Sequence, residues 1–151
     1  MVLGILRGLK TTLGYFFRPK VTVQYPNQKR AYAPRFRGRH ELTRYDNGLE
    51  KCVGCELCAG ACPSNCITVV GAENDPEHPH SPGERYGVHW EVNLLRCIFC
   101  GYCQEACPTG ALHLSRFNEL AEYSREKEVY TKERLLEPRP GVFNTGKEAV
   151  G

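Results

Sequence analysis

Residues 52–63 have the sequence Cys-Val-Gly-Cys-Glu-Leu-Cys-Ala-Gly-Ala-Cys-Pro, and residues 97–108 have the sequence Cys-Ile-Phe-Cys-Gly-Tyr-Cys-Gln-Glu-Ala-Cys-Pro. Both stretches follow the pattern C-x2-C-x2-C-x3-C-P, and each cysteine of the first matches one of the second at an offset of 97 − 52 = 45 residues. A match at eight cysteines and two prolines marks an internal repeat. The repeat holds all but one of the nine cysteines of this 151-residue chain, and it decides the fold.

The cysteine spacing suits iron–sulfur clusters. Three cysteines at two-residue gaps in an irregular loop can turn their sulfurs toward one centre, and Gly54, Gly60 and Gly101 let backbone N–H groups approach inorganic sulfide. The fourth cysteine precedes a proline, which fixes φ and suits the first turn of a short helix. This cysteine therefore points away from its own loop and is free to reach the cluster of the other repeat, as in bacterial two-cluster ferredoxins.

We therefore predict two [4Fe–4S] clusters, each bound by three cysteines of one repeat and the fourth cysteine of the other. The predicted ligands of cluster 1 are Cys52, Cys55, Cys58 and Cys107. The predicted ligands of cluster 2 are Cys62, Cys97, Cys100 and Cys103. Four thiolates leave no open position for a substrate, so the sequence predicts outer-sphere electron transfer and no catalytic residue.

Two other uses of the cysteines fit less well. Structural zinc sites normally use two separated C-x2-C pairs, without a third cysteine two residues on. Disulfides require an oxidising compartment, and residues 1–20 contain no clear signal peptide. The alternative to an electron-transfer protein, from another functional class, is a zinc-binding interaction module. Cys66 is left over, and because the repeat has Ala111 at the equivalent position, we expect a small buried side chain there instead of a ligand.

Charge divides the chain into two parts. Residues 1–51 carry 11 − 3 = +8 and residues 52–151 carry 9 − 14 = −5, which together give the net charge of +3. Such asymmetry indicates that the two parts face different surroundings. No RRM, KH or zinc-finger pattern accompanies the basic residues, so nucleic acid is not an expected partner. With 41% hydrophobic and 25% charged residues, the chain is neither a disordered tail nor a membrane bundle.

Four segments follow from these patterns. Residues 1–17 form an amphipathic helix, with Leu6, Leu9 and Leu13 on one face, which we expect to dock at a membrane surface or on a membrane subunit. The alternative is a helix that covers the chain's own core. Residues 18–51 form an extended basic arm with little regular structure. Residues 52–114 form an α+β ferredoxin-like core with pseudo-two-fold symmetry, and residues 115–151 form short helices and a tail.

Within the core we expect helical turns over residues 64–66 and 109–113 and strands over residues 67–70 and 112–114. The strand over residues 88–92 should pair with that over 67–70, and the proline-rich stretch 71–87 should be a turn-rich loop, not a metal site at His78 and His80. Ser124 and Thr131 are the expected N-caps of two short helices.

No nucleotide-binding site is expected in this chain. Residues 141–147 resemble the start of a phosphate-binding loop, but Glu148 replaces the required Ser or Thr, and no strand precedes the stretch. The chain also contains no G-x-G-x-x-G, so no nicotinamide or flavin site is expected.

The sequence resembles the subunit I family of NADH–quinone oxidoreductase, respiratory complex I, over about residues 15–137. The cysteine pattern is common to many ferredoxins, and other stretches make the resemblance specific. These are Phe-Arg-Gly-Arg-His-Glu-Leu at 36–42, Pro-Gly-Glu-Arg-Tyr at 82–86, Arg96 with Thr-Gly-Ala at 109–111, and Tyr-Thr-Lys-Glu-Arg-Leu-Leu at 130–136.

This resemblance implies an electron-relay subunit of an oxidoreductase, without a catalytic site of its own. Its two clusters would pass single electrons from the flavin side toward the cluster beside the quinone site. It implies that NADH, flavin and quinone bind mainly to other subunits, and that the partners are peripheral-arm iron–sulfur subunits, quinone-site subunits and a membrane subunit. Because no transit peptide is visible, we expect the cytoplasmic side of a bacterial inner membrane. The alternatives are a related membrane-bound hydrogenase or formate-linked complex, or a free two-cluster ferredoxin, which would leave the +8 arm unexplained.

Overall fold

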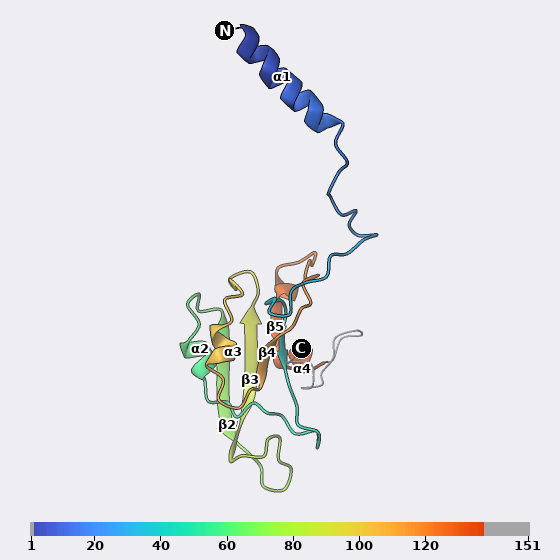
Figure 1. Ribbon diagram of the computed structural model, residues 1–151. Coiled ribbons are helices and arrows are strands. Elements are labelled where there is room, and N and C mark those ends of the chain that lie inside the picture. The colour runs from blue at the N-terminus through green and yellow to red at the C-terminus, as the bar shows by residue number, and fades with distance from the viewer. Residues whose placement is uncertain (1, 138–151) are drawn as a thin grey trace. The chain divides into compact units, whose positions relative to one another are not determined.

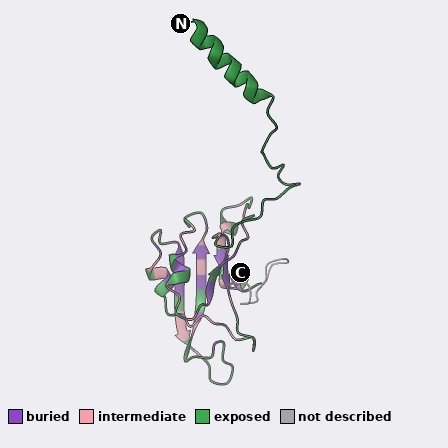
Figure 2. Ribbon diagram, viewed as in Figure 1, coloured by how far each residue is buried: buried purple, intermediate pink, exposed green. Residues whose placement is uncertain are grey.

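The computed structural model describes residues 2–137, and the chain divides into two compact units, Met1–Ala31 and Tyr32–Gly151. The first unit contains helix α1 (Val2–Phe16), which confirms the helix predicted near the start of the chain. Every described residue of α1 is exposed, including its leucines and Phe16 (Figure 2). Within residues 2–137, no helix combines the length and the apolar character needed to cross a bilayer.

The second unit is built on two small antiparallel sheets (Figure 1). Strands β2 (Ile67–Glu73), β3 (Arg85–Asn93) and β5 (Val129–Thr131) form one sheet in the order β2-β3-β5. Strands β1 (His40–Leu42) and β4 (Leu112–Leu114) form the other. The α+β class is confirmed, and so is the predicted pairing of 67–70 with 88–92, with Val69 opposite Trp90.

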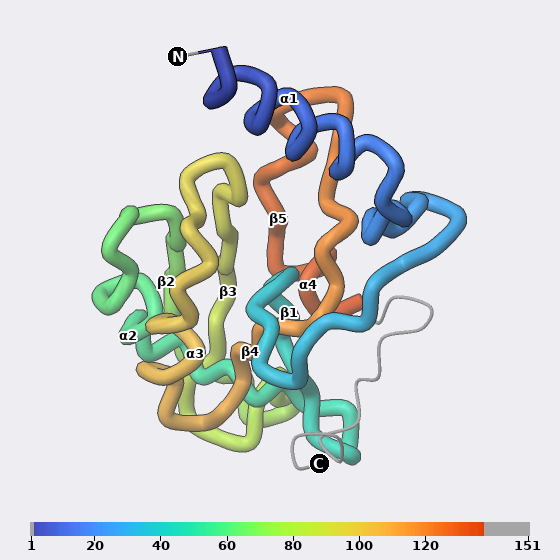
Figure 3. Tube along the Cα trace, turned by 45° about the horizontal axis from the view of Figure 1, so that its top comes forward, coloured from blue at the N-terminus to red at the C-terminus, as the bar shows by residue number. Residues whose placement is uncertain are grey.

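The repeat at an offset of 45 residues is present in the secondary structure as well as in the sequence. Helix α2 (Leu57–Gly60) corresponds to helix α3 (Tyr102–Glu105), and the first residue of β2 corresponds to that of β4. The last strand of each repeat pairs with the strand that leads into the other repeat: β2 pairs with β3, and β4 pairs with β1. Helices α2 and α3 lie side by side (Figure 3). Each repeat therefore completes its strand pairing with a strand that belongs to the other repeat.

The short helices precede the Cys-Pro pairs, so the helical turns predicted over 64–66 and 109–113 are wrong. After each Cys-Pro the chain makes a single turn, closed by the bonds from Asn65 N–H to the Cys62 carbonyl (3.3 Å) and from Gly110 N–H to the Cys107 carbonyl (3.4 Å). Asn65 and Gly110 then adopt positive φ values of 47° and 61°. A left-handed residue cannot continue a right-handed helix, so the chain passes directly into a strand.

The folded unit is larger than residues 52–114. Strand β1, inside the predicted arm, is buried throughout, because its pairing with β4 brings Leu42 into the core. Tyr130 of β5 and Leu135 of helix α4 (Lys132–Leu136) are also buried there. The core side chains with the least exposure are Leu42, Trp90, Val92, Ala111, Leu112, Tyr130 and Leu135.

One of the two predicted N-caps is correct. Thr131 occupies the N-cap position of α4, as predicted. Arg125 precedes the 3-10 helix η1 (Glu126–Glu128), so the N-cap predicted at Ser124 is wrong. The tail after residue 137 and the rejected phosphate-loop stretch 141–147 lie outside the described residues.

A buried ion pair fixes the start of α4. Lys132 Nζ lies 2.7 Å from Glu50 Oε2, and the two side chains are only 12% and 7% exposed. The same ammonium donates to the Gly87 carbonyl of β3 at 2.7 Å. Arg44 approaches Glu50 from the surface at 3.5 Å. Because a buried charge without its partner is strongly destabilising, Lys132 secures the start of α4 to β3 and to the segment around Glu50.

We expect Lys132→Met to lower the unfolding free energy by about 3 kcal/mol, because the Glu50 carboxylate would stay buried and keep only the more distant ion pair with Arg44 among residues 2–137. The matched control is Lys127→Met, at an exposed position, which should change it by less than about 0.5 kcal/mol. Urea unfolding of the cluster-loaded chain, followed by circular dichroism, compares the two. Equal midpoints for the two variants would contradict this role of Lys132.

Candidate metal centres

The two cysteine loops share an unusual backbone conformation. Three positions of each repeat have positive φ, and they correspond pairwise at the 45-residue offset. The pairs are Gly54 with Phe99, Glu56 with Gly101, and Asn65 with Gly110. A positive φ is uncommon in residues other than glycine, and three of these six are not glycine. Because different residue types adopt the same conformation, the loop geometry is a property of the site and not of local glycine content.

Backbone N–H groups point at the cysteine sulfurs in both repeats. Cys97 Sγ accepts from Phe99 N–H at 3.3 Å. At the corresponding Cys52, burial raises the pKa of the thiol, and the backbone N–H of Gly54 acts to lower it. Cys62 Sγ accepts from Cys66 N–H at 3.4 Å, and Cys107 Sγ accepts from Ala111 N–H at 3.3 Å. Such donors stabilise electron-rich sulfur, which is the chemistry that an iron–sulfur ligand requires.

Hydrogen bonds make the fourth cysteine of each repeat easier to ionise. Burial raises the pKa of Cys62, but hydrogen bonds from Cys66 N–H and the Ser64 hydroxyl outweigh burial and lower that pKa to about 7. The pKa of Cys107 is also lowered, because N–H groups and the Thr109 hydroxyl outweigh its burial. These are the two cysteines predicted to bind the cluster of the opposite repeat.

The four cysteines predicted for cluster 1 line one cavity. They share it with apolar side chains that include Leu42, Val69, Trp90 and Leu112. Cys107 is close enough to Cys52 and Cys58 for its charge to raise the pKa of both thiols, in addition to the effect of burial. The structure thus brings the last cysteine of the second repeat to the loop of the first.

The cysteines predicted for cluster 2 gather in the same way. Burial, together with charges on Cys58, Cys100 and Cys62, raises the pKa of Cys103 to about 12. Burial also raises the pKa of Cys97, and Cys103 and Cys62 act on it in the same direction. Cys62 of the first repeat therefore lies with the loop of the second. Cys58 and Cys103, at corresponding positions on α2 and α3, are where the two groups approach each other.

Among residues 2–137, no three His, Cys, Asp or Glu side chains meet as ligands of a single metal ion. A [4Fe–4S] cluster does not require such a meeting, because each of its four thiolates binds a different iron atom. The sulfurs and the N–H donors fit such a cluster at both positions, and the cavity of the cluster 1 cysteines also has an apolar lining. Exposure differs among the ligands, since Cys55 is exposed, whereas Cys58, Cys62 and Cys103 are buried.

Two side chains near the sulfurs were not identified from the sequence. Burial raises the pKa of the Cys58 thiol to about 11, and the indole of the nearby Trp90 acts in the opposite direction. His40 Nε2 lies 3.8 Å from Cys97 Sγ, and burial lowers the pKa of His40 to about 4, so the ring is neutral. His40 lies 57 residues from Cys97 in the chain. Only the pairing of β1 with β4 brings it close, and no local pattern announces that pairing.

Cys66 is buried, with 5% of its surface exposed, as expected for this position. Its Sγ lies 3.4 Å from Cys62 Sγ, and burial raises the pKa of the Cys66 thiol to about 12. Cys66 does not line the cavity of the cluster 1 cysteines. That it is not a ligand stays a prediction.

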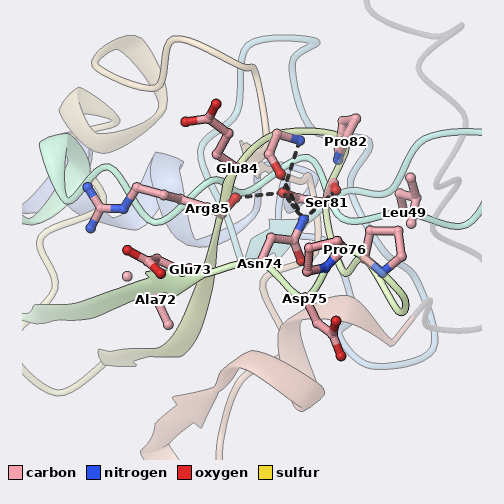
Figure 4. A pocket seen from close by; sticks show the side chains of 13 residues that line it. Leu49, Ala72, Glu73, Asn74, Asp75, Pro76, Ser81, Pro82, Glu84 and Arg85 are labelled. Atoms are coloured by element: carbon pink, nitrogen blue, oxygen red, sulfur yellow. Dashed lines mark hydrogen bonds between the residues drawn. The ribbon is translucent and has the colours of Figure 1, made fainter.

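A separate hollow of about 910 Å³ lies at the loop between β2 and β3 (Figure 4). Asn74 closes this loop, since its amide donates to the carbonyls of Ser81 (2.7 Å) and Gly83 (2.8 Å). The His80 ring stacks on Tyr86 with a centroid distance of 4.4 Å. The predicted turn-rich loop is confirmed over residues 74–84, whereas residues 71–73 and 85–87, predicted as part of the loop, belong to β2 and β3. No cysteine lines this hollow, so it is distinct from the two metal centres.

Comparisons with known proteins agree with these centres. Residues 51–111 match a family model described as a 4Fe-4S dicluster domain. Over 142 residues the chain is 60% identical to NADH-quinone oxidoreductase subunit I 1 of Symbiobacterium thermophilum, a match that covers 94% of this chain and 88% of that protein. It is 53% identical over 146 residues to NADH-quinone oxidoreductase subunit 9 of Thermus thermophilus, covering 97% and 80%.

A solved structure with a related fold belongs to the membrane-bound sulfane sulfur reductase, an archaeal respiratory membrane complex. One of its chains matches with a TM-score of 0.52 and 32% sequence identity, over 78% of this chain. The match spans 56% of that longer chain, just over half of its length.

We expect Gly54→Ala to remove cluster 1 and to spare cluster 2. A Cβ at Gly54 would lie 2.7 Å from both the Gly71 Cα and the Tyr86 carbonyl oxygen, and φ there is +65°. These are backbone atoms, so the loop itself must move. The matched control is Gly60→Ala in α2, where a Cβ meets nothing within 4 Å.

Iron and acid-labile sulfide analysis measures the result. Iron should fall from about eight to about four atoms per chain in Gly54→Ala and stay near eight in Gly60→Ala. Full iron content in Gly54→Ala would show that the contact with Gly71 does not shape the loop.

Proposed function

The chain belongs to the family of NADH–quinone oxidoreductase subunit I, and from that premise we propose that it relays single electrons through two [4Fe–4S] clusters, from the flavin side of the complex toward the cluster beside the quinone site. One observation carries this function: each group of cysteine sulfurs combines three cysteines of one repeat with the fourth of the other. That is the arrangement of a two-cluster ferredoxin.

We assign the ligands as the sequence predicts them. Cluster 1 is held by Cys52, Cys55, Cys58 and Cys107, and cluster 2 by Cys62, Cys97, Cys100 and Cys103. When bound, each cluster supplies a one-electron couple. The residues around it tune that couple, because N–H donors such as those of Phe99 and Ala111 favour the electron-rich state and the apolar side chains limit access of water. Four thiolates on each cluster leave no position for substrate, so the chain conducts electrons without chemistry of its own.

The first unit serves attachment in this proposal. Helix α1 exposes Leu6, Leu9 and Leu13, and its basic residues Arg7 and Lys10 lie on another arc. A short amphipathic helix with this composition suits a membrane interface or the surface of a membrane subunit. We place the chain at the inner membrane of a bacterium, peripherally and on the cytoplasmic side, with the extended residues 18–31 reaching toward neighbouring subunits.

A second candidate is the corresponding subunit of another membrane-bound respiratory complex. The likeness to a chain of the sulfane sulfur reductase favours it, because the same fold works there in a different complex. The identity of 32% to that chain is well below the 60% to the subunit I relative, so NADH–quinone oxidoreductase is the better supported assignment. Co-purification from membranes distinguishes the two through the neighbouring subunits.

We expect Cys62→Ala to damage cluster 2, although Cys62 belongs to the first repeat. Its sulfur is grouped with Cys97 and Cys103, so its loss leaves one iron of cluster 2 without a protein ligand. EPR of the reduced full-length chain should lose one of two cluster signals. The matched variant is Cys107→Ala, which should remove the other signal. If Cys62→Ala and Cys52→Ala remove the same signal, the exchange of ligands between repeats is wrong.

We expect removal of residues 1–17 to leave both clusters intact and to weaken assembly into the membrane complex. All nine cysteines lie in the other unit, whereas the exposed leucines of α1 are lost. Iron content and the fraction of chain that sediments with membranes are the two measurements. Leu9→Glu should weaken sedimentation, and Thr11→Glu, on the opposite side of α1, should not. Normal membrane incorporation of the truncated chain would exclude a docking role.

A further inference from the structure

The thiol of Cys66 occupies a distinctive position beside cluster 2. Its Sγ is 3.4 Å from Cys62 Sγ, and Cys97 is close enough for its charge to act on the Cys66 thiol. Both neighbours are ligands of cluster 2 in the assignment above, and one comes from each repeat. We propose that Cys66 is a positioning residue whose thiol donates to the Cys62 sulfur and raises the reduction potential of cluster 2. This inference rests on the proposed function, because it requires the cluster.

The direction of the hydrogen bond follows from simple chemistry. A cysteine sulfur bound to iron has lost its proton, so Cys62 can only accept. Cys66 carries no iron in this assignment and keeps its S–H, and it is therefore the donor. The site is buried, with Cys66 only 5% exposed, so water does not compete for this sulfur. Low local polarity strengthens such a bond.

The internal repeat provides a built-in comparison. Ser64 and Thr109 place hydroxyls at 3.5 Å and 3.6 Å from the fourth cysteine of their repeats. The backbone N–H groups of Cys66 and Ala111 donate to the same sulfurs at 3.4 Å and 3.3 Å. These donors match one another across the offset. The side chain of Cys66 has no such match, because Ala111 carries a methyl group where Cys66 carries a thiol.

The effect on the potential has a definite sign. Reduction adds one electron to the cluster and increases the negative charge on its sulfurs, including those of the cysteine ligands. A hydrogen-bond donor therefore stabilises the reduced state more than the oxidised state, and the potential rises. The difference between the two states for one weak bond corresponds to about a three- to tenfold change in the ratio of reduced to oxidised cluster. For a one-electron couple this is about 30–60 mV.

The experiment is an EPR-monitored redox titration of the full-length chain, loaded anaerobically with iron and sulfide. Cys66→Ala should keep about eight iron atoms and lower the potential of cluster 2, with cluster 1 unchanged. Cys66→Ser retains a donor and should restore the potential. Ala111→Cys places a thiol at the matching point of the other repeat and should raise the potential of cluster 1. The Cys62→Ala and Cys107→Ala variants assign the two signals.

Three results would overturn the proposal. The first is an unchanged cluster 2 potential in Cys66→Ala at full iron content, which would leave Cys66 a packing residue. The second is loss of iron in Cys66→Ala with retention in Cys66→Ser, which would make the side chain a ligand. The third is an equal shift of both clusters, which would indicate a general change in the fold. A wild-type chain that binds zinc and no iron would instead refute the proposed function itself.

Discussion

The exchange of two cysteines between the repeats is the constraint on which the rest of the structure depends. Cys62 and Cys107 leave their own loops, and each joins the sulfurs of the opposite loop. The strands follow the same exchange, with β2 on β3 and β4 on β1. Neither repeat is therefore complete alone, either in its hydrogen-bonded strands or in its group of cysteine sulfurs. Under the proposed ligand assignment the clusters would cross-link the two halves, which would couple metal binding to folding.

The two centres match each other in their backbone conformation, but the side chains around them differ. Left-handed residues recur at three matching positions, and N–H donors recur at matching sulfurs. The neighbouring side chains differ, however. Trp90 lies near Cys58, whereas His40 approaches Cys97. A relay needs two centres of similar construction and unequal environment, and a duplicated loop with divergent neighbours provides both.

The sequence predicted what depends on local spacing. The cysteine pattern indicated the two corresponding loops, and alternating residues indicated the pairing of 67–70 with 88–92, which the register confirms. The short helices were placed on the wrong side of Cys-Pro, because proline suggests a helix start and the left-handed residue two positions later cannot be foreseen. The grouping of thiols from different repeats could be inferred only because this cysteine spacing is characteristic of two-cluster ferredoxins.

The composition of the basic arm predicted only part of the role of its arginines and lysines. Charge counting treats each Arg and Lys as available for an external partner, but several act inside the folded unit. Arg37 lies 3.4 Å from Glu105, 68 residues away, and Arg39 is buried with its guanidinium bonded to the Arg134 carbonyl, 95 residues away. Partners this distant in sequence leave no periodic trace. The burial of His40 and Glu41 in β1 was missed for the same reason.

The uncovered leucines and phenylalanines of α1 set a condition on the chain before it meets its complex. A solitary helix cannot shield its own apolar side chains, and a contiguous exposed patch of this kind promotes self-association. All the cysteines lie in the other unit, so cluster insertion makes no use of the helix. Newly synthesised chains therefore keep this exposed apolar patch after the clusters are inserted, and their solubility in the cell depends on how soon a partner surface covers it.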